Sequence, residues 1–129
     1  PVEALAMRHP SLRPPYGRYR HVVAVEGART LVAFSGQLAV RADDTAPDGI
    51  EAQTRLILEN YDLMLADLGL ERRHLLRLTT YLIDPADRAG YMAARDAWVP
   101  EPPPASTLLY VAGLADPRCR VEIEALAAA

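Results

Sequence analysis

The residues best suited to chemistry lie near the end of the chain, where two carboxylates alternate with apolar side chains. Val121 and Ile123 point to one side of an extended segment, so Glu122 and Glu124 point to the other. If another subunit covers that second side, at least one carboxylate loses water and becomes a candidate to accept a proton or orient a water molecule. The alternative is a solvated pair on a sheet edge, and periodicity alone does not separate the two.

The composition narrows the classes of partner and cofactor. Cys119 is the single cysteine and the three histidines are dispersed, so we expect neither a disulfide nor a metal site. A net charge of -3 without a basic run argues against nucleic acid. The densest group of basic residues comprises Arg13, Arg18, Arg20 and His21. This segment either is solvated or forms a rim that faces an anion. No segment is apolar over the roughly 18 residues that would span a membrane, so we expect a soluble, cytoplasmic protein.

A single α+β domain must position these residues. The 129 residues fit one domain, 1–129, with an irregular arm at 1–15. Periodicity and turn residues predict two helices, one between Gly49 and Gly69 and one from Pro85 or Asp87 to Trp98. They also predict five strands, of which the first two form a hairpin: His21–Val25, Thr30–Phe34, His74–Ile83, Ser106–Val111 and Arg120–Ala127.

Two helices cover only one face of a mixed sheet, so the other face must meet water or another subunit. In the segment Ser106–Val111 both parities are largely apolar, which indicates that both faces of this strand are buried. A subunit interface is the economical explanation for the second face. The alternative is that a loop or the N-terminal arm covers it.

Five fragments, in this order and spacing, resemble the Rid (reactive intermediate deaminase, YjgF-like) family. They are Ser35-Gly36-Gln37, Gly49 through Gln53-Thr54, Thr80 to Asp84, Pro103 to Leu108, and Val121 to Ala125. The resemblance implies a chorismate-mutase-like homotrimer with small-molecule clefts between subunits. Well-understood members hydrolyse enamines and imines, such as 2-aminoacrylate, to 2-keto acids and ammonia, and they need no cofactor.

The resemblance also implies site residues. Glu122 matches the glutamate that handles the attacking water, and Gly36 matches a glycine whose backbone approaches the ligand. Tyr19 best fits the aromatic lid, with Tyr16 as a competitor. The implied ligand site further includes Ser35, Gln37, Ser106 and Thr107.

Three departures indicate a remodelled cleft. Ser106 stands where deaminating members have an arginine, and serine cannot form the charged, bidentate pair that a carboxylate needs. Arg95 replaces a ligand-contacting asparagine, and Leu108 replaces a cysteine. Our hypothesis is that Arg95, or less favourably Arg20, supplies a displaced cationic contact. The alternative is that Arg95 is a solvated helix residue near Asp96 and Glu101.

These observations support two functions from different classes. The first is an enzyme that adds water to a C=N or related bond of a metabolite other than 2-aminoacrylate. The second is a non-catalytic trimer that binds a metabolite or a partner protein. A nuclease, an activity sometimes attached to this family, fits poorly with the acidic chain.

Overall fold

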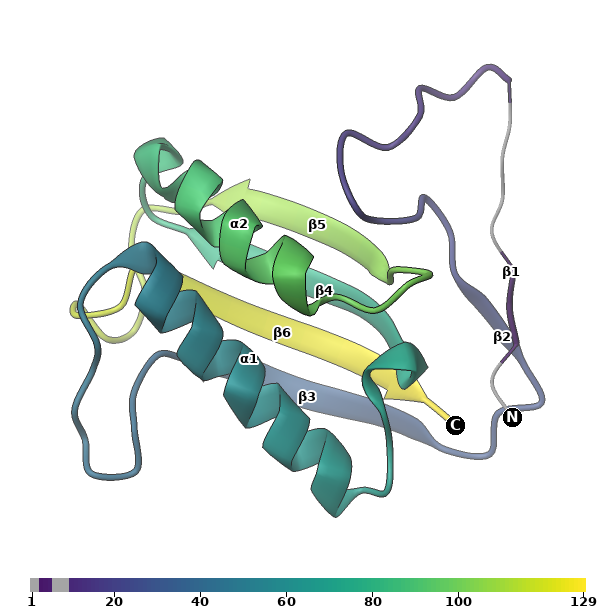
Figure 1. Cartoon of the computed structure of the whole chain (residues 1–129), viewed down its shortest axis with the longest axis horizontal. Helices are drawn as coiled ribbons and strands as arrows, with labels where there is room; N and C mark the ends of the chain where they lie inside the picture. The colour runs from purple at the N-terminus through teal and green to yellow at the C-terminus, as the bar shows by residue number, and fades with distance from the viewer. Residues whose placement is uncertain (1–2, 6–9) are drawn as a thin grey trace.

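The computed structural model of the protein describes residues 3–5, for their backbone, and 10–129. Within these ranges the main sheet has the strand order β3-β6-β4-β5 (Figure 1). Its strands are β3 (Leu31–Leu38), β4 (Leu75–Leu82), β5 (Ala105–Tyr110) and β6 (Val121–Ala128). β6 is antiparallel to both β3 and β4, whereas β4 and β5 are parallel. The α+β class and the mixed sheet are therefore confirmed.

Both long helices lie on one face of this sheet, as expected (Figure 1). They are α1 (Ile50–Asp67) and α2 (Arg88–Trp98), each preceding the next strand. Gly49 and Gly69, with φ of 88° and 70°, flank α1 in a backbone region that glycine enters without steric cost. Short 3-10 turns, η1 (Arg72–His74) and η2 (Pro85–Asp87), lead into β4 and α2. No helix in the described ranges is long and apolar enough to cross a membrane.

The predicted hairpin of His21–Val25 with Thr30–Phe34 is wrong. The first segment contributes only β2 (Ala24–Glu26), which pairs with β1 (Glu3–Leu5) in a separate two-stranded sheet. The second segment is the start of β3, whose partner is β6. The arm expected to be irregular therefore contains a strand, and its residues 1–2 and 6–9 lie outside the described part.

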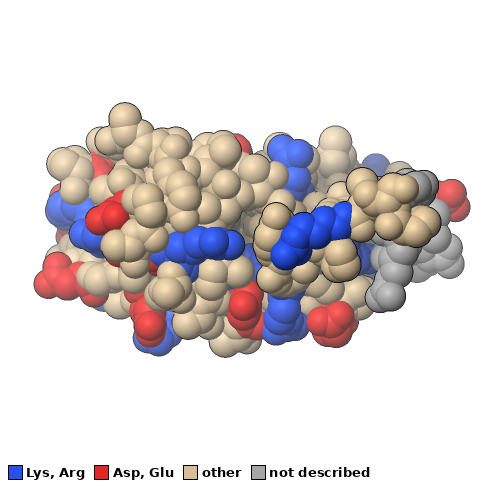
Figure 2. Space-filling view, turned by 90° about the horizontal axis from the view of Figure 1, so that it is seen from above, with Lys and Arg blue, Asp and Glu red and all other residues tan. Residues whose placement is uncertain are grey.

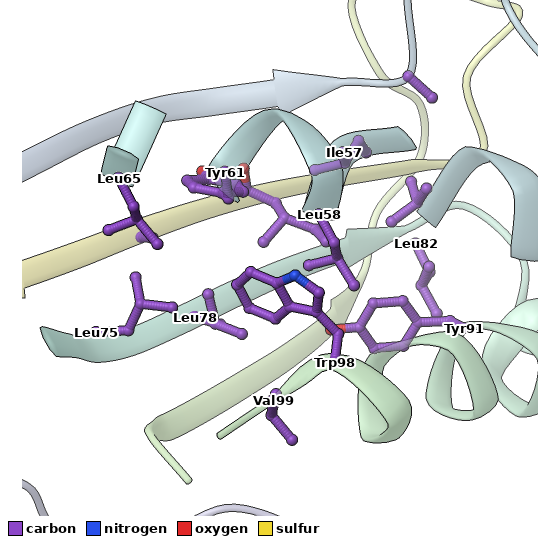
Figure 3. Packing of buried hydrophobic residues seen from close by; sticks show 14 of the residues in the cluster. Ile57, Leu58, Tyr61, Leu65, Leu75, Leu78, Leu82, Tyr91, Trp98 and Val99 are labelled. Atoms are coloured by element: carbon purple, nitrogen blue, oxygen red, sulfur yellow. Dashed lines mark hydrogen bonds between the residues drawn. The ribbon is translucent and has the colours of Figure 1, made fainter. Parts of the chain in front are cut away.

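The core lies between the helices and the sheet (Figure 3). Ile57, Leu58, Tyr61 and Leu65 of α1 and Tyr91 and Trp98 of α2 are buried against the inward side chains of the sheet, which include Leu78, Leu82, Val121 and Ile123. Asp62 joins α1 to its neighbours, because it accepts two 2.7 Å bonds from Arg72 and one of 3.1 Å from the Trp98 indole. The two helices therefore cover the helix side of the sheet, and the core residues there are buried within one chain.

The other face of the sheet is uncovered within one chain. Leu31 and Leu109 are 72% and 46% exposed on it, and Ala33 and Thr107 are also exposed. The expectation that both faces of the strand at 106–111 are buried is therefore not met by a single chain. Residues 10–23 do not cover this face either, because Thr107 and Leu109 remain open.

Two buried tyrosines make stability sensitive to alkaline pH. Burial raises the pKa of Tyr61, with the charges of Glu124 and Glu122 adding to it, and burial also raises the pKa of Tyr91. Above about pH 10 the unfolded chain releases these protons while the folded chain keeps them, so rising pH favours unfolding. We expect the unfolding free energy to fall by about 1.4 kcal/mol per pH unit for each buried tyrosine.

Urea titrations between about pH 9 and about pH 11 measure this slope. The chain contains no lysine, so lysine titration does not mask the effect. Tyr61→Phe is expected to lower the slope by about 1.4 kcal/mol per pH unit, while Tyr91, Tyr81 and Cys119, whose pKa values are also raised in the folded chain, continue to contribute. Equal slopes in the wild type and Tyr61→Phe would contradict the assignment.

Candidate functional site

A β-bulge in β3 shapes the surroundings of Glu122. The register between β3 and β6 shifts between Phe34 and Gln37, so Ser35 and Gly36 together oppose the single residue Glu124, and β3 contains one extra residue. The Tyr61 hydroxyl supports the bulge from the helix side, where it donates to the carbonyl oxygens of Ile123 at 2.8 Å and Ser35 at 3.3 Å. The Gln37 side chain also donates to the Ser35 carbonyl at 3.1 Å. The three residues of the Ser35-Gly36-Gln37 fragment are therefore one local structure.

Glu122 lies directly over this bulge on the uncovered face. A Cβ atom at Gly36 would stand 2.3 Å from Oε2 of Glu122, so only glycine leaves room for the carboxylate. Glu122 is half-buried, and its carboxylate accepts no hydrogen bond from residues 10–129. Its oxygens are thus positioned by packing and remain available to a water molecule or a ligand. The structure brings Glu122 together with Ser35, Gly36 and Gln37.

The second carboxylate, Glu124, has a different environment that sequence reasoning missed. It accepts a short hydrogen bond from the hydroxyl of Tyr81, and that bond raises the pKa of Tyr81. Tyr81 is the cross-strand neighbour of Glu122 and reaches Glu124 diagonally. The alternation of β4 places Tyr81 on the uncovered face, which is a signal that the sequence already contained.

A shallow hollow of about 270 Å³ adjoins Glu124 on the same face. It is lined by Ala33, Phe34, Arg77, Thr79, Glu124, Ala125 and Leu126. Thr79 pairs in register with Glu124 on one side and with Thr107 on the other, so these three residues form a row across the open face. The uncovered face therefore carries a polar row of Glu124, Thr79 and Thr107 across three of its strands.

Arg95 is buried, and the alternative of a solvated helix residue is wrong. Its side chain is 1% exposed, and Nη1 donates to the Asp96 carboxylate at 3.0 Å. Nη2 has no hydrogen-bond partner among the described residues. Arg95 shares the inward face of α2 with Tyr91 and Trp98, so its guanidinium lies on the helix side of the sheet.

The two lid candidates lie together in the N-terminal segment. Tyr16 is 73% exposed, with the Arg13 guanidinium 3.6 Å above its ring. The Tyr19 hydroxyl accepts a bond from the Tyr16 backbone N–H at 3.2 Å, and its ring meets His21 edge-on. The next residue, Arg20, donates from Nε to the Pro103 carbonyl at 2.5 Å.

The predicted site residues form two separate groups within one chain. Glu122 and the bulge lie on the uncovered face, beside Tyr81. Ser106 of β5 lies on the helix side of the sheet. Its register partner on β4, Leu78, pairs in turn with Ala125 of β6, which is three residues after Glu122. Arg95 also lies on the helix side. Residues of both groups can meet in one site only if a second chain contributes one of them.

Comparison with known proteins identifies the family. Residues 11–129 match the family described as Endoribonuclease L-PSP. The mitochondrial protein mmf2 of Schizosaccharomyces pombe is 33% identical over 115 residues, which cover 87% of this chain and 88% of mmf2.

Solved structures agree with this match. YyfB of Yersinia pestis, of the conserved Rid protein family, superposes with a TM-score of 0.83 at 26% identity over 98% of both chains. RidA from the Antarctic bacterium Psychrobacter sp. PAMC 21119 gives 0.73 at 25% identity, over 97% of this chain and 99% of that one. The chain belongs to the Rid/YjgF/L-PSP family.

Proposed function

We propose that the protein is a homotrimer whose intersubunit clefts hydrolyse the C=N bond of a small metabolite, an imine or enamine other than 2-aminoacrylate. The observation that carries this proposal is the Glu122 carboxylate, held over Gly36 without a hydrogen-bond partner within residues 10–129, on a sheet face that its own chain leaves open. A second copy on that face would exclude water around Glu122. It would also bring the second group of site residues toward it.

The chemistry needs one carboxylate and one water molecule. Glu122 accepts a proton from water as the oxygen attacks the carbon of the protonated C=N bond, which gives a neutral carbinolamine. Glu122 returns this proton to the nitrogen, the C–N bond then breaks as the C=O bond forms, and ammonia leaves with the hydroxyl proton as ammonium. Backbone N–H groups at the bulge, from Gly36 and Gln37, would steady the developing charge, and Tyr19 would close the cleft.

Residue 106 is the reason that 2-aminoacrylate is left out of the proposed substrates. Ser106 is half-buried and uncharged, so it offers a free carboxylate no permanent charge at this position. The neighbouring inward residue, Leu108, packs against the core. The same two residues favour the second candidate function, a trimer that binds a metabolite without turning it over.

We do not include nucleic acid among the proposed ligands. The net charge is -3, and on the face shown in Figure 2 the basic and acidic side chains are interspersed, without a continuous basic tract.

The decisive experiment measures keto-acid release from imines that an amino-acid oxidase generates from a panel of amino acids. We expect acceleration on at least one bulkier imine and little on 2-aminoacrylate. Glu122→Gln should reduce kcat/KM by about a hundredfold or more, because the amide cannot accept the water proton. Robust turnover of 2-aminoacrylate would contradict the interpretation of Ser106. Ligand binding that survives Glu122→Gln, with no turnover in either protein, would favour the binding trimer.

A further inference from the structure

The two carboxylates of β6 turn toward different neighbouring strands on the uncovered face. β6 lies between β3 and β4 in the sheet (Figure 1). Oε2 of Glu122 lies 2.3 Å from the position that a Cβ atom would take at Gly36 of β3. Glu124 instead accepts a hydrogen bond from the hydroxyl of Tyr81 on β4. Glu122 therefore leans toward the bulge, and Glu124 leans toward Tyr81.

The side chain of Tyr81 is close enough to bond either carboxylate. Glu122 is its register partner on β6, and Glu124 is its diagonal neighbour. Directly opposite Cβ atoms on one face of an antiparallel pair are about 5 Å apart, and an aromatic side chain also reaches the diagonal neighbour. All three side chains are half-buried, which strengthens a hydrogen bond between them relative to bulk water. Distance alone thus does not decide which carboxylate receives the Tyr81 hydrogen bond.

The single hydroxyl proton of Tyr81 serves one carboxylate at a time. A phenol has one O–H donor, so the bond to Glu124 withdraws that donor from Glu122. The bond to Glu124 is the main cause of the raised pKa of Tyr81, followed by desolvation and by the charges of Glu124 and Glu122. The neighbour of Tyr81 on β5 is the uncharged Leu109. The charged groups that face Tyr81 are Arg77 of its own strand and Glu122 and Glu124 of β6.

A hydrogen bond from Tyr81 to Glu122 would impair the role proposed for Glu122. A donor that bonds a carboxylate favours its charged form, so the carboxylate becomes a poorer acceptor for the proton of water. The bond would also draw the Glu122 side chain toward β4 and away from Gly36, where it now lies. The choice of Glu124 as the acceptor therefore bears directly on the proposed reaction.

We propose that Glu124 is a positioning residue, which accepts the Tyr81 hydroxyl and so keeps this donor from Glu122, leaving the Glu122 carboxylate free over Gly36 to accept a proton from water. The proposal rests on the proposed function, because the proton acceptor is the one assigned there. It gives Glu124 no contact with the substrate. Without Glu124, the Tyr81 hydroxyl has one remaining carboxylate within reach, and Tyr81 becomes an inhibitor of Glu122.

The kinetic test compares kcat/KM on the preferred imine in three variants. Glu124→Ala should reduce it about tenfold or more, because the Tyr81 hydroxyl turns to Glu122. Adding Tyr81→Phe to Glu124→Ala should restore most of the lost activity, because the competing donor is gone. Glu124→Gln is the matched control: it removes the same charge, but its amide oxygen still accepts the Tyr81 hydrogen bond, so it should lose much less than Glu124→Ala.

A merely structural role predicts the opposite order. If the Tyr81–Glu124 pair only stabilised the sheet, the double variant would be at least as impaired as Glu124→Ala. That result would overturn the proposal, as would a Glu124→Ala protein as active as the wild type or a Glu124→Gln protein as impaired as Glu124→Ala. Circular dichroism on each variant shows that the activities compared are those of folded chains.

A titration of Tyr81 tests the transfer of the hydroxyl without any substrate. The readout is the 13Cζ NMR signal of the full chain labelled at tyrosine, and the Tyr81 signal is the one that Tyr81→Phe removes. In Glu124→Ala the pKa of Tyr81 should stay near its wild-type value, because the hydroxyl then bonds Glu122. It should fall toward about 10 only when Glu122→Ala is added. A fall in Glu124→Ala alone would overturn the proposal.

The two measurements separate this proposal from the proposed function. Intact imine hydrolysis in the wild type, together with an undiminished Glu124→Ala protein, would remove the role of Glu124 and leave the proposed function standing. A wild-type protein that hydrolyses no imine would overturn the proposed function and, with it, the catalytic benefit of Glu124, whatever the titration shows.

Discussion

Leu109→Glu is expected to convert the proposed trimer into folded monomers. Leu109 is 46% exposed on the uncovered face of β5, and its register partner Tyr81 pairs in turn with Glu122. A carboxylate there would be buried at the proposed interface in the same row as the negatively charged Glu122. Burying an unpaired charge costs several kcal/mol, and about 1.4 kcal/mol is tenfold in affinity. We therefore expect assembly to weaken by about a hundredfold or more.

Sedimentation velocity across a concentration series measures the change, and circular dichroism shows that the variant is folded. Leu63→Glu is the matched control, because Leu63 is 67% exposed on α1, within the helix layer on the other side of the sheet. The control should assemble like the wild type. A Leu109→Glu protein that dissociates no more readily than Leu63→Glu would show that this face is not the interface. A wild-type protein that sediments as a monomer would contradict the trimer itself.

The helices and the last strand could be predicted because their signals are local. In α1 the apolar spacing and the flanking Gly49 and Gly69 lie within one short stretch of chain, and the helix begins and ends between these glycines. The alternation from Val121 onward likewise placed Glu122 opposite the core. In both cases the periodicity of side chains decides which side is buried, whatever the partner element is.

The hairpin failed because strand pairing is not a local property. The turn residues between β2 and β3 favour a hairpin, but Leu31 and Val32 pair with Ala128 and Ala127 at the far end of the chain. The backbone N–H groups of Arg29 and Thr30 both donate to the carbonyl of Ala129, which anchors the start of β3 there. Propensity indicates that a segment is extended and says little about its neighbour.

The candidate site could be predicted in part. The bulge fragment and Glu122 were found separately, but their contact at Gly36 depends on the β3–β6 register and could not be seen in the sequence. The burial of Arg95 did have a signal: it follows Tyr91 by four residues and precedes Trp98 by three, so all three share one helix face. The alternative of a solvated Arg95 was considered in spite of this spacing, because arginine is seldom fully buried.

Gly36→Ala is expected to reduce kcat/KM on the preferred imine by about a hundredfold while changing the unfolding free energy by less than about 1 kcal/mol. The new methyl group would lie 2.3 Å from Oε2 and 2.9 Å from Cδ of Glu122, so one of the two side chains must move. The backbone of Gly36 is not in the left-handed region, and alanine is accommodated there. The flexible end of Glu122 therefore yields, and the carboxylate leaves the position from which it would orient water.

A double-mutant cycle separates this displacement from a general defect. Gly36→Ala should cost nothing further in a Glu122→Gln background, because the two substitutions disable the same group. Gly113→Ala is the control, since a Cβ there meets no atom within 4 Å, and it should retain full activity and stability. Additive losses in the double variant, or a Gly36→Ala protein that unfolds several kcal/mol more easily, would mean that Gly36 serves the fold and not the position of the Glu122 carboxylate.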